Sequence, residues 1–153
     1  MYGLKRNERW HLEVPDGVRK SDDGLVEIWW DQTVSTPTKF PSNRPDMMIV
    51  DRRSKKWFMV DFAVPFDSNV VKTEEKKIGK YRDLAAEVAR MNTAKVEVVP
   101  IVVGALGIVS KDLLSWLKML GVGDVVGGLQ TAAVIRTATI LKKVLNRMTV
   151  GIG

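Results

Sequence analysis

The chain has 153 residues, of which 45% are hydrophobic and 27% are charged, a composition typical of one folded domain and not of a disordered or fibrous protein. Its 24 Lys and Arg residues outnumber 18 Asp and Glu residues, and the resulting net charge of +6 makes nucleic acid the first candidate partner. The lack of cysteine and the single histidine exclude disulfides, Cys-ligated metal sites and His-cluster sites. A bound metal would therefore need oxygen ligands.

No segment has the composition of a membrane span or a secretory signal. The longest apolar run, 98–109, is interrupted by Pro100, Gly104 and Gly107 and is too short to cross a bilayer. Residues 1–10 contain no apolar segment. We expect no membrane partner.

The first half of the chain predicts a lead-in followed by strands. Residues 1–24 are polar and contain two turn sequences, so we expect little regular structure there. The segment 25–35 is rich in β-branched and aromatic residues and predicts a strand. Residues 36–45 contain three prolines and predict a loop.

A hairpin and a helix are predicted next. Residues 47–51 and 57–64 have strand character and are joined by the basic turn 52–56. After Pro65, Thr73 followed by two glutamates is typical of a helix N-cap, and the helix should run to about Met91.

The second half predicts one more strand and two helices. Residues 96–103 form a valine-rich run typical of a strand buried on both faces, which we expect at the centre of the sheet. Ser110 should cap a short helix ending near 120, and 129–147 should form an amphipathic helix. The order predicts an α/β fold whose mixed central sheet, made of hairpin strands and one helical crossover, is flanked by helices. The domain should span 25–147, followed by a tail at 148–153.

Two carboxylates should converge in the predicted hairpin. Asp46 lies at the start of one strand, and Asp61, after fourteen intervening residues, lies on its neighbour. Paired carboxylates suit a hard cation such as Mg²⁺, which a phosphodiester hydrolase uses to polarise phosphate and activate water. A turn residue and a solvent-facing strand carboxylate would also explain them.

A helical wheel of 74–91 places a lysine on the apolar face of the predicted helix. Lys77 falls in the middle of the apolar stripe, Lys80 lies at its margin, and Glu74 lies over it one turn earlier. Burying an ammonium is costly unless it is paired or functional, although Lys77 would also be explained by its head reaching solvent. The stripe comprises Tyr81, Leu84, Val88 and Met91, with Ile78 and Ala85 beside it.

Five ordered motifs give the chain a resemblance to a known family. The sequence resembles the restriction-like endonuclease domain at the C-terminus of site-specific non-LTR retrotransposon polyproteins, which belongs to the PD-(D/E)xK superfamily. The resemblance covers roughly residues 10–147. It is carried by WDQT, RPDMMIVD, MVDFAVPFDSNV, KIGKYRDLAAEV and VEVVPIVVGALG.

The resemblance implies a DNA endonuclease, a hydrolase that depends on Mg²⁺ or Mn²⁺. It implies that Asp46 and Asp61 are the metal-binding carboxylates, and that Lys77, Lys80 and Tyr81 match the family's K-x-x-K-Y motif. DNA is then the implied partner, and a nuclear location is implied as well. Tyr81 is also explained as a core residue, and Lys80 as a phosphate contact or a solvent-exposed lysine.

The chain differs from the wider superfamily at one position, and it lacks other domains of the family's polyproteins. Ala63 stands where the superfamily has its lysine, two residues after the second carboxylate; relocation of the lysine to the following helix resembles the retrotransposon branch. The family's reverse transcriptase and zinc knuckle are not in this sequence, so we expect an isolated C-terminal piece whose partner would be a missing reverse transcriptase domain.

Further residues are secondary candidates. Asp31 is either a third acidic residue of the site or a cap at a strand end, and Glu74 is a second such candidate. Arg44, Arg52 and Arg53 are candidates for contacts with the DNA backbone, or else belong to a solvated surface. The alternative function is a catalytically silent nucleic-acid-binding module derived from such a nuclease.

Overall fold

The computed structural model describes residues 17–121, 127–131, 133–137 and 139, which fall into two compact units. The first unit holds the described residues up to Phe62 together with Glu75–Ile101. The second holds Ala63–Glu74 and the described residues from Val102 onward.

A five-stranded mixed sheet runs through the chain in the order β1-β2-β3-β4-β5. The first four strands pair antiparallel to their neighbours. β4 and β5 run parallel, because Lys95 N–H donates to Lys55 C=O and Val103 N–H donates to Ala63 C=O with the same residue offset. The strands are β1 (Val18–Lys20), β2 (Val26–Trp30), β3 (Met47–Asp51), β4 (Lys56–Ala63) and β5 (Lys95–Val102). The sheet and its helices confirm a mixed α/β architecture.

Two strands differ from the sequence prediction near the N-terminal side of the sheet. β1 lies within the segment expected as an irregular lead-in, where it pairs with β2 across a turn at Asp22–Gly24. β2 ends at Trp30 and not at Ser35, because Asp31 adopts a left-handed backbone with φ of 49° that ends the extended conformation.

The strand predicted at the centre of the sheet is at its end. β5 is the last strand in the described order, so the central placement was wrong. Its second half, Val99–Val102, is buried, whereas its first half is partly exposed. The valine-rich run therefore indicates that other residues cover the faces of this strand. It does not indicate that the strand has a hydrogen-bonded neighbour on each side.

Helix α1 (Val70–Asn92) begins three residues before the predicted cap. A 3₁₀ turn, η2 (Asp67–Asn69), leads directly into α1, so Thr73 is inside the helix and the predicted N-cap was wrong. The 3₁₀ turn η2 therefore forms the start of the helix in place of a capping side chain.

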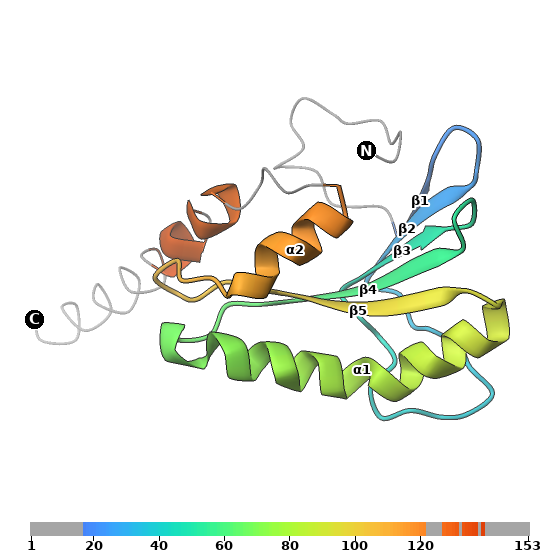
Figure 1. Ribbon diagram of the computed structural model, residues 1–153, viewed down its shortest axis with the longest axis horizontal. Coiled ribbons are helices and arrows are strands. Elements are labelled where there is room, and N and C mark those ends of the chain that lie inside the picture. Colours follow the sequence, from blue (N-terminus) through green and yellow to red (C-terminus); the bar gives the residue numbers. More distant parts are fainter. Residues whose placement is uncertain (1–16, 122–126, 132, 138, 140–153) are drawn as a thin grey trace, which may run out of the picture. The chain divides into compact units, whose positions relative to one another are not determined.

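The core of the first unit lies between one face of the sheet and α1 (Figure 1). Alternate residues of β3 and β4 point to α1, as expected for strands, and the predicted helical stripe packs on them. The exception is Met91, which stays exposed. The buried members are Val34, Met48, Val50, Trp57, Met59, Tyr81, Leu84, Ala85 and Val88.

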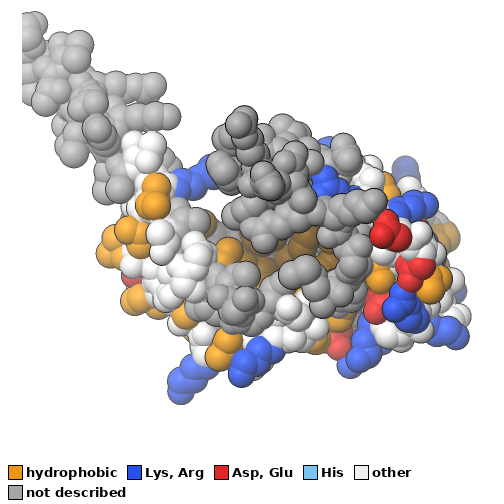
Figure 2. Space-filling view, turned by 90° about the horizontal axis from the view of Figure 1, so that it is seen from above, with side chains coloured by type: hydrophobic (Ala, Val, Ile, Leu, Met, Phe, Trp, Pro, Cys, Tyr) orange, Lys and Arg blue, Asp and Glu red, His pale blue; other side chains and the backbone are white. Residues whose placement is uncertain are grey.

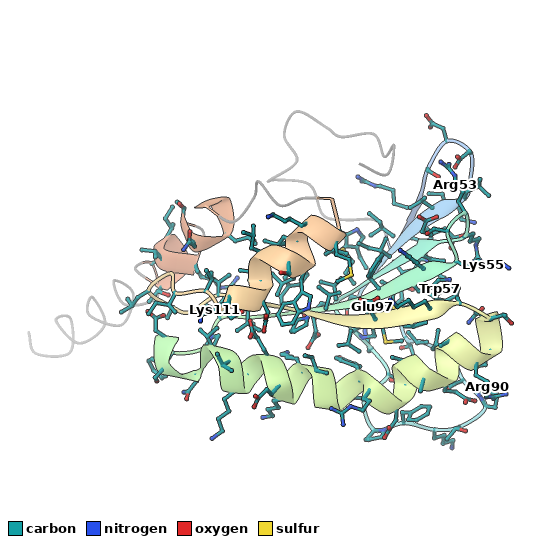
Figure 3. All side chains as sticks on the ribbon, in the orientation of Figure 1. Arg53, Lys55, Trp57, Arg90, Glu97 and Lys111 are labelled. Atoms are coloured by element: carbon teal, nitrogen blue, oxygen red, sulfur yellow. The ribbon has the colours of Figure 1, made fainter. Side chains whose placement is uncertain are left out.

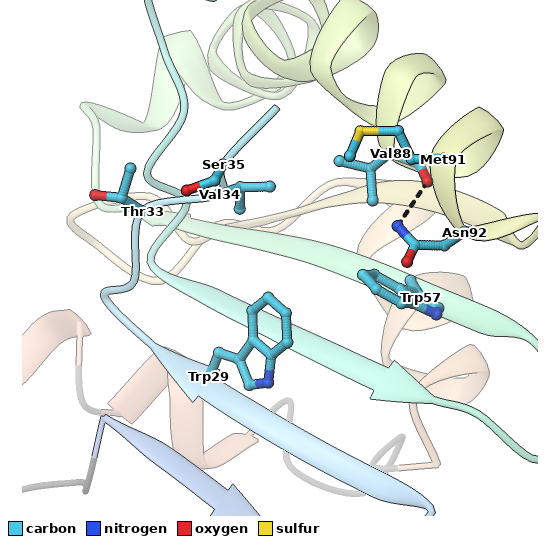
Figure 4. Close-up of a pocket in the computed structure, with 8 residues that line it drawn as sticks. All are labelled: Trp29, Thr33, Val34, Ser35, Trp57, Val88, Met91 and Asn92. Atoms are coloured by element: carbon cyan, nitrogen blue, oxygen red, sulfur yellow. Dashed lines mark hydrogen bonds between the residues drawn. The ribbon is translucent and has the colours of Figure 1, made fainter. Parts of the chain in front are cut away.

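A pocket of about 330 Å³ opens on this face beside the C-terminal end of α1 (Figure 4). Trp29 and Trp57 meet edge to face in it, with ring centroids 5.9 Å apart. Trp29 packs against the core, and its indole N–H donates to Glu27 at 2.8 Å. Both tryptophans therefore contribute to the packing of the first unit.

The second unit contains helix α2 (Lys111–Met119), which begins where the sequence predicts. Ser110 caps it, accepting a hydrogen bond from Leu113 N–H at 3.2 Å. Residues 127–131, 133–137 and 139 are helical, and the rest of the helix predicted at 129–147 lies outside the described residues, as does the tail at 148–153. No helix in the described part of the chain has the length and apolar character needed to cross a membrane.

Candidate functional site

Asp46 and Asp61 face each other at one end of the β3–β4 hairpin. Met47 pairs with Val60, so Asp46, one residue before β3, is opposite Asp61 in the same antiparallel register. Main-chain bonds fix both groups. Phe62 N–H donates to Asp46 Oδ2 at 2.7 Å, and Asp46 N–H donates to Asp61 Oδ1 at 3.4 Å. The two carboxylates therefore lie together in the first unit.

Their proximity perturbs the titration of Asp46. Loss of solvent around the carboxyl group raises the pKa of Asp46, although the residue as a whole is exposed, and the neighbouring Asp61 raises it further. The hydrogen bond from Phe62 and the ammonium of Lys77 oppose this rise in the pKa. A bound cation would relieve the remaining repulsion between the two carboxylates.

Lys77 lies directly against Asp61. Its Nζ is 2.5 Å from Asp61 Oδ2, and the exposed fractions of the two side chains are 22% and 3%. The wheel predicts that Lys77 points from α1 to the sheet, and this ion pair agrees with that direction. The pair satisfies an otherwise buried negative charge.

Lys80 and Tyr81 complete this cluster from the next turn of α1. Lys80 Nζ is 3.9 Å from Asp61 Oδ2 and 4.7 Å from the centre of the Tyr81 ring. A side-chain interaction with Tyr81 raises the pKa of Lys80, and burial raises the pKa of Tyr81, so both groups keep their protons at neutral pH. The buried Tyr81 donates its hydroxyl hydrogen to Arg44 C=O at 3.2 Å, which ties α1 to the segment before Asp46.

Asp31 and Arg44 form a second pair beside this segment. Arg44 Nε and Nη2 donate to the two carboxylate oxygens of Asp31 at 2.7 and 2.9 Å, and Nε also donates to Asp31 C=O at 3.0 Å. Asp31 N–H donates to Asp46 C=O at 2.9 Å. Asp31 is thus paired with arginine instead of joining the other carboxylates. The sequence holds no signal for this pair, because it depends on the left-handed backbone of Asp31.

Glu74 lies in the second unit. It is buried there and accepts a hydrogen bond from Ser110 Oγ at 2.5 Å. This geometry gives Glu74 a structural role in the start of α2, whose cap is the same serine.

Arg52 and Arg53 follow the opposite end of β3 from Asp46, roughly 20 Å away at the rise of an extended chain. Arg52 pairs with Glu27 at 3.5 Å and lies over the Trp57 ring, while Arg53 pairs with Asp23. Arg53 stands at the turn between β3 and β4 (Figure 3), and Figure 2 shows acidic and basic side chains intermixed at the right-hand end of its view. The structure does not bring these arginines to the two aspartates.

The donor set fits a hard divalent cation. Mg²⁺ commonly binds through one or two carboxylates and keeps several waters. The described residues contain no group of three or more Asp, Glu, His or Cys side chains able to hold a metal, so this chain would contribute Asp46 and Asp61 and leave the remaining positions to water and substrate.

Comparison of the chain with protein-family models and with curated proteins found no match.

Proposed function

We propose that this chain is a divalent-metal-dependent DNA endonuclease with a restriction-endonuclease-like fold of the PD-(D/E)xK type. The observation that carries the proposal is the meeting of Asp46, Asp61 and Lys77 at the end of one hairpin. The antiparallel β3–β4 pair, the helical crossover and the parallel β5 are consistent with the fold assignment. The resemblance of the ordered sequence motifs supports the same function.

Asp46 and Asp61 would hold Mg²⁺ or Mn²⁺, which when bound polarises the phosphoryl oxygen and lowers the pKa of the attacking water. Phe62 N–H keeps Asp46 Oδ2 in place, so the carboxylate needs little reorganisation to accept a cation. Lys77 is the group that would orient the water or stabilise the charge on the phosphate.

Lys80 and Tyr81 have supporting roles in this proposal. Lys80 adds a second positive charge on the same side of Asp61, and its side chain is 41% exposed, so it is accessible to a phosphate group. Tyr81 is buried and positions Arg44 and, through it, the segment that carries Asp46.

One observation favours a second function, that of a silent nucleic-acid-binding module. The Lys77 ammonium is within 2.5 Å of Asp61, so it already neutralises the carboxylate that the metal requires. A chain that keeps this ion pair in the presence of Mg²⁺ would retain its basic surface for DNA without cleaving it.

Nicking of supercoiled plasmid tests the proposal. We expect nicking in Mg²⁺ or Mn²⁺ that is abolished by EDTA and reduced at least about 100-fold, the size of effect typical of a lost charge-stabilising group, by Asp46→Asn or Asp61→Asn. Asp51→Asn is the matched control, because Asp51 ends the same strand and lies away from the site. Equal nicking by all four proteins would refute the site, and absence of metal-dependent nicking with DNA binding retained would favour the silent module.

A further inference from the structure

The Arg44 guanidinium holds a carboxylate in a geometry that phosphate can reproduce. Its Nε and Nη2 atoms donate in parallel to both oxygens of Asp31, at 2.7 and 2.9 Å. Arginine presents the same fork of donors to two oxygens of a phosphate group. The pair is open to solvent, with 57% of the Arg44 side chain and 72% of the Asp31 side chain exposed.

The pair lies on the surface, outside the core of the first unit. The left-handed backbone of Asp31 costs free energy in a residue with a Cβ atom. An incoming anion can therefore replace the Asp31 carboxylate without disrupting the core.

The guanidinium is fixed close to the candidate metal site. Arg44 is two residues from Asp46, a Cα separation of at most about 7 Å in an extended chain. Its carbonyl accepts the Tyr81 hydroxyl, and Tyr81 adjoins Lys80, whose ammonium is 3.9 Å from Asp61. A DNA strand at the carboxylates would have a neighbouring phosphate within reach of this arginine.

We propose that Arg44 is the binding site for a phosphodiester of DNA beside the cleaved one, and that Asp31 occupies it in the free protein as an internal substitute for phosphate. The proposal rests on the DNA-binding part of the proposed function. It makes Asp31 a residue that weakens DNA binding and not a third metal ligand, since both of its carboxylate oxygens are engaged by Arg44.

The test is the affinity of the full chain for a fluorescein-labelled duplex, measured in EDTA over a range of salt concentrations. Asp31→Asn should bind at least about threefold tighter than the natural chain, with a salt slope steeper by about 0.9, the value for one added phosphate contact. Asparagine tolerates the left-handed conformation, so the backbone at this position is retained. Arg44→Gln should bind more weakly, and the double variant should match Arg44→Gln.

Glu87→Gln is the matched control for the change in net charge. Glu87 accepts two hydrogen bonds from Arg90, at 2.7 and 3.1 Å, on α1 about 15 Å along the helix axis from Lys77. It should change the affinity less than Asp31→Asn does. Equal effects of the two variants, unchanged or weaker binding by Asp31→Asn, or no DNA binding by any variant would overturn the proposal.

The plasmid assay keeps the two proposals separable. Nicking by the natural chain without tighter binding by Asp31→Asn would refute the role of Asp31 alone. Tighter binding through Arg44 without metal-dependent nicking would refute the nuclease alone.

Discussion

The Asp61 carboxylate is the most constrained group of the candidate site. Its side chain is 3% exposed, and it is contacted by the Lys77 ammonium, by the Asp46 main chain and more distantly by Lys80. Asp46 is exposed and bears the electrostatic cost of the pair as a raised pKa. Asp61 is thus buried and tightly held, whereas Asp46 is the more accessible of the two proposed metal ligands.

The raised pKa of Asp46 predicts that Asp46→Asn is at least as stable as the natural chain at neutral pH without metal. The folded chain binds the Asp46 proton more tightly than the unfolded chain does, so the free energy of unfolding falls as pH rises through the raised pKa. Asparagine keeps an acceptor for Phe62 N–H and removes the repulsion from Asp61.

Urea denaturation in EDTA at several pH values measures this difference. The excess in free energy of unfolding of Asp46→Asn over the natural chain should shrink as the pH falls through the raised pKa toward the ordinary carboxyl value of 3.8. A variant that is less stable than the natural chain at neutral pH by more than about 1 kcal/mol would contradict the electrostatic account.

The ion pair of Lys77 predicts competition with metal. Lys77→Met should lower the free energy of unfolding by about 1–3 kcal/mol in EDTA, because it removes the close ammonium and leaves the buried Asp61 with the long hydrogen bond from Asp46 N–H and the more distant Lys80. A cation at Asp61 compensates this loss, so Mg²⁺ should raise the Tm of Lys77→Met more than that of the natural chain.

Lys76→Met is the control for this experiment, because Lys76 is an exposed neighbour on the same helix. It should change stability by no more than about 0.5 kcal/mol and respond to Mg²⁺ as the natural chain does. The same response to Mg²⁺ in all three proteins would rule out competition at Asp61.

At the scale of elements, α1 carries Lys77 and Tyr81 on the same apolar face that packs on the sheet, with Lys80 at the margin of that face. The period of the apolar stripe was sufficient to predict that Lys77 faces the sheet, and the hairpin was sufficient to bring Asp46 opposite Asp61. The start of α1 was not predictable in the same way, since η2 replaces the capping side chain on which the sequence rule depends. The pairing of Asp31 with Arg44 also escaped prediction, because it follows from one left-handed residue and a contact across thirteen positions.

A substitution at Gly79 tests whether α1 acts as a rigid support for Lys77 and Lys80. It lies between Lys77 and Lys80, and a Cβ atom added there would meet nothing within 4 Å. Gly79→Ala should raise the free energy of unfolding by about 0.5–1 kcal/mol, because alanine restricts the unfolded chain and favours helix.

Denaturant unfolding measures this change, and Gly104→Ala is the contrasting variant. A Cβ atom added at Gly104 would collide with the carboxylate of Asp67, so this substitution should lower the free energy of unfolding. Nicking by Gly79→Ala should equal that of the natural chain. A stabilised Gly79→Ala with lost nicking would show that the site needs a flexible α1.

For the whole molecule, the net charge of +6 favours DNA, but several of the basic groups are already paired. Arg53 pairs with Asp23, and Arg52 and Lys20 both pair with Glu27, so these groups attract DNA less than their number suggests. We propose DNA recognition near Lys80 and Arg44 because both lie beside the two carboxylates; Arg44 is itself paired with Asp31, so its contribution requires release of that carboxylate. Net charge alone did not predict this distribution, because it depends on which acids fold against which bases.

Binding of Mn²⁺ in the absence of DNA, followed by electron paramagnetic resonance, is the most direct test of the paired-aspartate site. We predict one site in the natural chain and in Asp51→Asn, and at least about tenfold weaker binding in Asp46→Asn and Asp61→Asn, since loss of even an outer partner of a metal ligand typically weakens binding about 10- to 100-fold. Equal Mn²⁺ binding by all four proteins, or no binding by the natural chain, would contradict the claim that Asp46 and Asp61 form a metal site.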